Sequence, residues 1–208
     1  MLRSNLVRCS GLALMLAGAL LVVADLLSPT HLFFPVGFQS FSEPTIGTSD
    51  SLYYALQSKI NLLAAMLLSG GLVGLHARQA EATGLLGLVG FLVAFLGTAL
   101  LVGILWTNAF VVPSLAVEAP TLLGGGPPVA FYPSLVAFAL GWVIFGIATL
   151  RAGRYPRTGT ILLIIGALTN LFPLPFTGFV FALAVAWMGC YAFCSRRDML
   201  NEHATPTR

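Results

Sequence analysis

The chain has 208 residues, of which 58% are hydrophobic and only 8% are charged, and its formal net charge at pH 7 is +3. A globular domain carries roughly 25% charged residues, so this composition excludes a water-soluble protein and predicts an integral membrane protein. Residues 82–117, 119–150 and 158–195 contain no Asp, Glu, Lys or Arg at all. The positive charge does not predict nucleic-acid binding, because no soluble segment is long enough to carry a basic surface.

These uncharged runs predict an all-α fold, in which residues 1–208 form a single transmembrane domain of six helices. About 20 apolar residues are needed to cross a bilayer. Pro173 and Pro175 divide the last run, because a proline removes a backbone donor and clashes with the preceding turn. The predicted helices, in chain order, are about 10–27, 52–75, 82–106, 129–150, 158–172 and 176–194. Two long loops, 28–51 and 107–128, lie on the outer side, and 195–208 forms a short cytoplasmic tail.

The basic residues predict the orientation of this bundle. With six helices, nine of the ten basic residues fall on one side of the membrane: Arg3, Arg8, Arg78, Arg151, Arg154, Arg157, Arg196, Arg197 and Arg208. Cytoplasmic segments carry the excess of Lys and Arg, so both termini are expected in the cytoplasm. The expected location is the inner membrane of the cell, with the lipid bilayer as the main partner.

Lys59 is the one basic residue inside a predicted span, and an ionisable residue there is a candidate for function. Lys59 and Asp25 are equally far along the chain from their cytoplasmic anchors, His76 and Arg8. At 1.5 Å per residue, both lie about 25 Å above the inner boundary, so an ion pair between them is geometrically allowed. The favoured alternative is that Lys59 reaches up to the outer headgroups and that Asp25 simply ends a helix.

Two amides, Asn61 and Asn170, fall in the outer third of the membrane in this parse, together with Gln57, Ser58 and Thr169. Amide side chains commonly form hydrogen bonds between transmembrane helices, so packing is the favoured interpretation. A polar pocket that opens outward is the alternative. Gly70 and Gly74 form a GxxxG pair, and Gly84, Gly87 and Gly90 follow, which fits close helix packing.

The sequence carries no catalytic, nucleotide-binding or metal-binding motif. Cys190 and Cys194 lie four residues apart on one helix, but a metal site would need further Cys or His ligands at that level. No cofactor is expected, and an enzyme is not favoured.

The stretch from Gly74 to Leu123 combines a basic turn with the segment Trp106-Thr107-Asn108-Ala109-Phe110-Val111-Val112-Pro113. In this it resembles a family of uncharacterised bacterial multi-pass membrane proteins. The resemblance covers about a quarter of the chain and implies a bacterial origin, but no activity.

Two classes of function remain. The protein either binds or transports a small or lipophilic molecule at the outer side, or it is a non-catalytic scaffold or accessory subunit. In the first class Lys59 would set a preference for an anionic group, and the chain would act alone, as a homo-oligomer or with a membrane partner.

Overall fold

The structure, a computed structural model, describes residues 2–27, 50–118, 131–171 and 177–204. Side chains are described for residues 8–27, 56–115, 117–118, 131–171 and 178–194. Every regular element in these ranges is a helix, which confirms the predicted all-α class. The elements are α1 (Leu2–Leu26), α2 (Asp50–Trp106), the π-helical turn η1 (Thr107–Val111), α3 (Val112–Glu118), α4 (Phe131–Ala152), α5 (Arg157–Thr169) and α6 (Thr177–Ala204).

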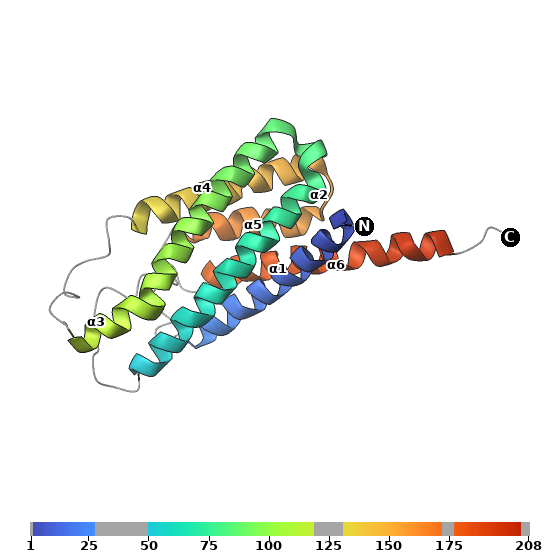
Figure 1. The fold of residues 1–208 in the computed structure, drawn as a ribbon. Coiled ribbons are helices and arrows are strands. Elements are labelled where there is room, and N and C mark those ends of the chain that lie inside the picture. The colour runs from blue at the N-terminus through green and yellow to red at the C-terminus, as the bar shows by residue number, and fades with distance from the viewer. Residues whose placement is uncertain (1, 28–49, 119–130, 172–176, 205–208) are drawn as a thin grey trace.

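The long helix α2 folds back on itself (Figure 1). A straight helix of its 57 residues would measure about 86 Å, but Gly84 has non-helical dihedral angles, φ 56° and ψ −147°. Glycine adopts this conformation readily because it has no Cβ. His76 before the reversal stacks on Phe91 after it, with ring centroids 4.4 Å apart. We call residues 50–83 the first arm of α2 and residues 85–106 the second arm.

The turn was predicted at the polar residues 76–81, which is too early in the chain. These residues are helical in the structure. His76 and Gln79 face the interior, where Gln79 Nε2 donates a hydrogen bond to Thr149 Oγ1 at 2.8 Å. Polar character therefore does not mark the turn, and the conformational freedom of Gly84 does.

The predicted loop 107–128 also differs from the structure, because its first part continues the helix through η1 and α3. Pro113 has no backbone N–H to donate to the carbonyl of Ala109. In the widened turn before it, the Val112 N–H donates to the Thr107 carbonyl. Residues 119–130 of this predicted loop, and residues 28–49 of the other, lie outside the described residues.

The last apolar run forms two helices, α5 and α6, as predicted, although Pro173 and Pro175 themselves lie outside the described residues. Residues 195–204, predicted as part of a tail, are helical. A criterion based on apolar length stops at the bilayer edge and cannot detect a polar continuation of the same helix.

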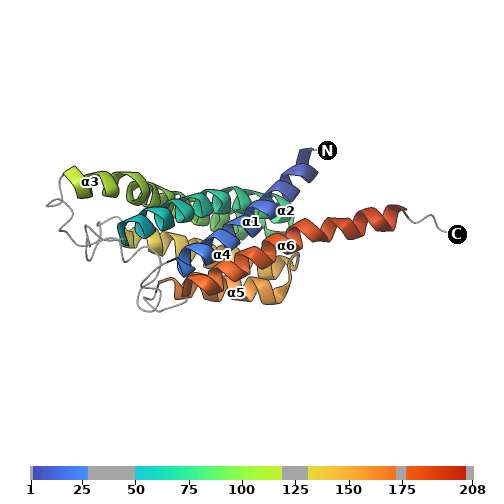
Figure 2. The ribbon, with the colours of Figure 1, turned by 90° about the horizontal axis from the view of Figure 1, so that it is seen from below.

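The helices close into a ring. The first arm of α2 packs on α1, α1 on α6, α6 on α5, α5 on α4, and α4 on the second arm of α2. Figures 1 and 2 both show α1 lying along α6, although they are distant in sequence. The start of α1 and the end of α6 lie at the same end of the bundle. Large side chains fill the interior, among them Leu14, Leu72, Trp142, Phe145, Leu163 and Met188.

Glycines permit the closest helix contacts. A Cβ atom at Gly97 in the second arm would strike the backbone of Phe138 in α4, and one at Gly141 in α4 would strike the backbone of Ala94. α1 and α6 approach in the same way, since a Cβ at Gly18 would lie 2.6 Å from a carbonyl oxygen of α6. Backbone cannot rotate aside as a side chain can, so these positions require glycine.

The predicted GxxxG pair in the first arm is half correct. Gly74 faces Ser10 of α1, as expected, but Gly70 faces open space. The neighbouring Gly71 makes the second contact, against Leu14.

Three segments of the described chain are long and apolar enough to cross a membrane: Arg8–Leu26, Leu56–Leu115 and Phe131–Ala152. The second includes both arms of α2. Arg157–Thr169 and Gly178–Cys194 are shorter apolar helices. Large apolar side chains such as Leu85, Leu96 and Leu183 also face outward, so the bundle is compatible with a lipid environment.

Candidate functional site

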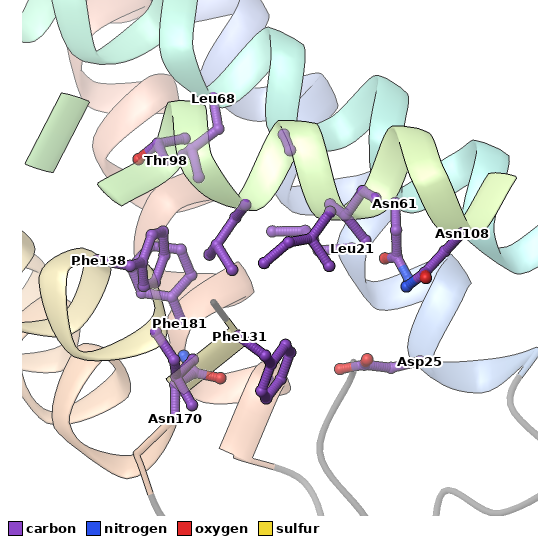
Figure 3. A pocket seen from close by; sticks show the side chains of 16 residues that line it. Leu21, Asp25, Asn61, Leu68, Thr98, Asn108, Phe131, Phe138, Asn170 and Phe181 are labelled. Carbon is purple, nitrogen blue, oxygen red and sulfur yellow. The ribbon is translucent and has the colours of Figure 1, made fainter. Parts of the chain in front are cut away.

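A cavity of about 100 Å³ lies inside the ring of helices, near the end opposite to the chain termini. It is bounded by the C-terminal part of α1, both arms of α2, η1, the start of α4, the end of α5 and the first turn of α6. Four side chains with polar ends, Asp25, Asn61, Asn108 and Asn170, converge on it (Figure 3). We call this cavity the polar pocket.

Asp25 carries the only charge among the lining residues that the structure describes. Its side chain is buried, and Oδ2 lies against the first turn of α6, where a Cβ atom on Gly178 would be 2.5 Å away. Glycine at position 178 therefore makes room for the carboxylate. The start of α6 also favours it, because the unpaired N–H groups of a helix N-terminus carry positive partial charge.

Asn61 and Asn108 bring two amide side chains to the pocket wall. Their side chains are 4% and 2% exposed, and neither Oδ1 atom has a hydrogen-bond partner among the described residues. Figure 3 shows their amide ends close together, and the Asp25 carboxylate lies below them in this view and points towards Phe131. Asn61 is on the first arm of α2, whereas Asn108 is in η1, so the reversal at Gly84 is needed to bring them to one site.

Asn170 lines the pocket on the other side of Phe131 (Figure 3). It is the C-cap residue of α5, and its Nδ2 donates a hydrogen bond to the Gly166 carbonyl at 2.8 Å. This bond fixes which end of the amide is the donor. The Asn170 oxygen is thereby left as an acceptor.

Thr98 contributes little free hydrogen-bonding capacity to the pocket wall. Its hydroxyl donates to the Ala94 carbonyl at 2.6 Å and accepts a hydrogen bond from Trp142 Nε1 at 3.2 Å. The remainder of the wall is apolar and is made by Leu21, Ala65, Leu68, Leu101, Ile104, Leu105, Phe131, Leu135, Phe138 and Phe181. An apolar cavity with a few convergent polar groups is typical of small-molecule sites.

Lys59 lies outside this site. Its side chain is exposed, and it does not line the polar pocket. No ion pair with Asp25 occurs among the described residues, because Asp25 points into the bundle and Lys59 points away from it. The favoured expectation, that Lys59 reaches the outer headgroups, stays a prediction.

Of the four candidate residues identified from sequence, the structure thus brings Asp25, Asn61 and Asn170 together and separates Lys59 from them. Sequence reasoning missed Asn108, because the predicted helix ended at Trp106 and the next residues were assigned to a loop. The available signal was Pro113, because a proline inside a helix removes one regular hydrogen bond. π-helical turns are rare, occur mostly as single turns inside α-helices, and often lie at functional sites.

A second group of polar side chains lies at the opposite end of the bundle. The Arg78 guanidinium lies over the rings of Tyr155 and Tyr191, at 5.1 and 5.6 Å from their centroids. Burial raises the pKa of Tyr155 to about 12, and the positive charge of Arg78 acts to lower it. This group links α2, the α4–α5 turn and α6, and no described cavity accompanies it.

No protein-family model, curated protein or solved structure matches this chain. The polar pocket is therefore interpreted from its own residues, and the resemblance to uncharacterised bacterial membrane proteins stays a prediction.

Proposed function

We propose that this is a multi-pass protein of the bacterial inner membrane, with six spans formed by α1, the two arms of α2, α4, α5 and α6. The basic residues Arg8, Arg78, Arg151, Arg154 and Arg157 lie towards the end where α1 begins and α6 ends. The positive-inside rule assigns that end to the cytoplasm. α5 has 13 residues, or about 20 Å, and local thinning of the bilayer accommodates a span of this length.

In this orientation the polar pocket lies in the outer part of the bundle, and its proposed function is to bind a small molecule there. The observation that carries the proposal is the pair of buried side chains Asn61 and Asn108, which line the same cavity and whose amide oxygens have no hydrogen-bond partner among the described residues. A buried polar group without a partner costs about 1–3 kcal/mol. A ligand or ordered water in the pocket would remove that cost once rotation of the amide turned its oxygen towards the cavity.

The alternative function, a non-catalytic scaffold, predicts different hydrogen bonds for the same residues. If the amides only held helices together, they would form hydrogen bonds between helices. The Asn170 amide instead bonds a carbonyl of its own helix, and the oxygens of Asn61 and Asn108 have no partner among the described residues. We therefore favour the binding function. The apolar outer surface would be covered by lipid, by a second copy of the chain or by another membrane protein.

Access to the pocket can be tested by thiol chemistry. In a protein whose Cys9, Cys190 and Cys194 are replaced by serine, Asn108→Cys places one thiol at the pocket wall. In lipid nanodiscs, we expect this thiol to react with methyl methanethiosulfonate, a small neutral reagent. The rate constant should fall at least tenfold when Ala65→Leu fills the pocket.

Ala99→Leu supplies the matched control, because it adds the same atoms to an exposed position of α2 that does not line the pocket. It should leave the rate constant within twofold. If the thiol is unreactive, or if both leucine variants slow it equally, the pocket does not admit small molecules and the scaffold function is favoured.

A further inference from the structure

The end of the bundle opposite to the polar pocket carries a basic surface that the proposed pocket function does not use. It consists of Arg151, Arg154 and Arg157 on the α4–α5 turn, with Arg78 of α2 beside them. We infer that this surface binds the headgroup of an acidic phospholipid through its phosphate. The inference rests on the membrane location proposed above, and it holds whether or not the polar pocket takes a ligand.

Three arginines crowd the turn between α4 and α5. Arg151 lies in the last turn of α4, Arg157 is the first residue of α5, and Arg154 lies between them. All three side chains are exposed, and residues 151–157 contain no Asp or Glu. Like charges this close together repel one another, so an anion bound among them would relieve the repulsion.

Positive charge exceeds negative charge among the described side chains at this end of the bundle. Arg8 and Arg78 join the three arginines of the turn, whereas Glu81 is the one carboxylate that the structure describes there. The arginines of the turn form no ion pair with any described side chain. The surface is therefore complementary to an anionic partner.

Packing fixes the segments that carry these charges. The Arg78 guanidinium lies over the ring of Tyr155 in the turn, at 5.1 Å from its centroid, and over that of Tyr191 in α6, at 5.6 Å. At the next position of α2, Gln79 Nε2 donates a hydrogen bond to Thr149 Oγ1 of α4 at 2.8 Å. These contacts join α2, α4, the turn and α6, so the segments around the basic surface keep their relative positions.

The basic surface lies at the level of the lipid headgroups in the proposed topology. Trp187 of α6 is 52% exposed and lies beside the first turn of α5, where a Cβ on Gly159 would be 3.5 Å from its ring. Trp is enriched at the membrane–water interface. α5 itself is only about 20 Å long, so thinning of the bilayer around it would bring the headgroups to Arg157, its first residue.

One face of α5 provides for both parts of a lipid. Arg157, Ile161 and Ile165 are spaced four residues apart and therefore share a face of the helix. The two isoleucines are each 45% exposed, so an acyl chain can lie along them while the headgroup meets the arginine. A soluble phosphate ester has no apolar part to fill this face.

An acidic lipid complements the arginines better than a zwitterionic one. Guanidinium and phosphate groups form paired, charge-assisted hydrogen bonds, and basic pockets between transmembrane helices on the cytoplasmic side bind acidic lipid headgroups. In a zwitterionic lipid the ammonium group of the headgroup already balances the phosphate.

The arginines have a second explanation, because basic residues at the cytoplasmic ends of helices set the orientation of a membrane protein. That role depends on the number of charges. It predicts no preference of the purified protein for an acidic lipid, and no dependence of lipid binding on one particular arginine.

The test counts the lipids bound to the purified full chain in a nonionic detergent by native mass spectrometry. Dioleoylphosphatidylglycerol is compared with dioleoylphosphatidylcholine, which has the same acyl chains and a zwitterionic headgroup. We expect the first phosphatidylglycerol to bind about tenfold or more tightly than the first phosphatidylcholine. Glycerophosphoglycerol, the same acidic headgroup without acyl chains, should fail to displace the bound lipid at equal concentration.

Arg157→Gln should weaken phosphatidylglycerol binding about fivefold and leave phosphatidylcholine binding within about twofold. Lys59→Gln is the matched control, because it also removes one exposed positive charge, but at the other end of the bundle. It should leave both affinities within about twofold. The comparison of lipids on the wild-type protein decides the question even if Arg157→Gln fails to fold.

Equal affinities for the two lipids would overturn the preference for an acidic headgroup. Equal effects of Arg157→Gln and Lys59→Gln would overturn the location of the site, because lipid binding would then not depend on the basic surface. Displacement by glycerophosphoglycerol would overturn the lipid in favour of a soluble phosphate ester. None of these outcomes affects the polar pocket, whose function is tested by the reactivity of Asn108→Cys.

Discussion

A buried amide oxygen without a hydrogen-bond partner lowers the stability of the fold. An apolar side chain of similar size at the same position would avoid this effect. Leucine at position 61 would remove the unpartnered Oδ1 and fill part of the polar pocket. We therefore expect Asn61→Leu to raise the free energy of unfolding by about 1 kcal/mol, as measured by denaturation in detergent, while ligand binding is lost. A stabilising substitution that removes function is the usual sign of a binding residue.

Thr98→Val is the contrasting substitution at the wall of the same pocket. Valine has nearly the same shape, but it would leave the buried N–H of Trp142 without its acceptor. The free energy of unfolding should fall by about 1–3 kcal/mol. A destabilising effect of Asn61→Leu comparable to that of Thr98→Val would mean that Asn61 holds the fold together.

Tyr155, in the turn between α4 and α5, makes stability depend on pH in the alkaline range. Burial raises its pKa from 10.0 to about 12. Because the folded-state pKa exceeds the unfolded-state value, the neutral phenol stabilises the fold below pH 10, and this stabilisation is lost as the pH rises through 12. The two-unit difference corresponds to about 2–3 kcal/mol.

The melting temperature of the wild type should therefore fall more steeply between pH 10 and pH 12 than that of Tyr155→Phe, which has no ionisable hydroxyl. Parallel curves for the two proteins would show that Tyr155 does not contribute to this pH dependence.

At the scale of single elements, the reversal of α2 depends on the backbone of one residue. No neighbouring atom lies within 4 Å of a Cβ placed on Gly84, so Gly84→Ala acts through its positive φ alone. We expect it to lower the free energy of unfolding by about 1–3 kcal/mol. Gly103→Ala, also in open space but in regular helix, should instead raise it by about 0.5–1 kcal/mol. Effects of the same sign at both positions would contradict this explanation of the turn.

The contact between the second arm of α2 and α4 depends on close approach rather than on φ. A Cβ on Gly97 would meet the backbone of Phe138, so Gly97→Ala should push the two helices apart and lower the free energy of unfolding by about 1–3 kcal/mol. Because η1, which holds Asn108, directly continues this arm, we also expect a changed rate of Asn108→Cys modification. Gly103→Ala in the same arm should neither lower the free energy of unfolding nor change the rate of Asn108→Cys modification.

Apolar length and charge spacing were sufficient to predict that the chain is all helical and where most helices lie, because both properties follow from the solvent that surrounds the helices. They could not predict the reversal at Gly84 or the helical turn at Thr107–Val111. Those features depend on φ freedom at one glycine and on a missing N–H at Pro113. The sequence contains both residues, but neither changes the hydropathy that the prediction used.

For the whole molecule, depth along the helix axis was predictable and the direction of each side chain was not. The sequence placed Asp25 and Lys59 at one level and Asn61 half a turn deeper than Lys59. Rotation about the axis of α2 nevertheless turns Asn61 into the polar pocket and Lys59 out of it. Asn170 was predicted as a candidate because it lies near the end of a predicted helix, and this position determines its depth in the membrane. Asn108 was missed because its element was not recognised.

In the proposed topology, the end of the bundle that holds the polar pocket faces the outside of the cell. Glu118→Cys and Arg154→Cys place exposed thiols at opposite ends of the bundle. In intact cells expressing the cysteine-free protein with one of these substitutions, a membrane-impermeant maleimide should label Glu118→Cys. Arg154→Cys should be labelled only after the membrane is permeabilised. Labelling of Arg154→Cys in intact cells would place the pocket on the cytoplasmic side and contradict the proposed topology.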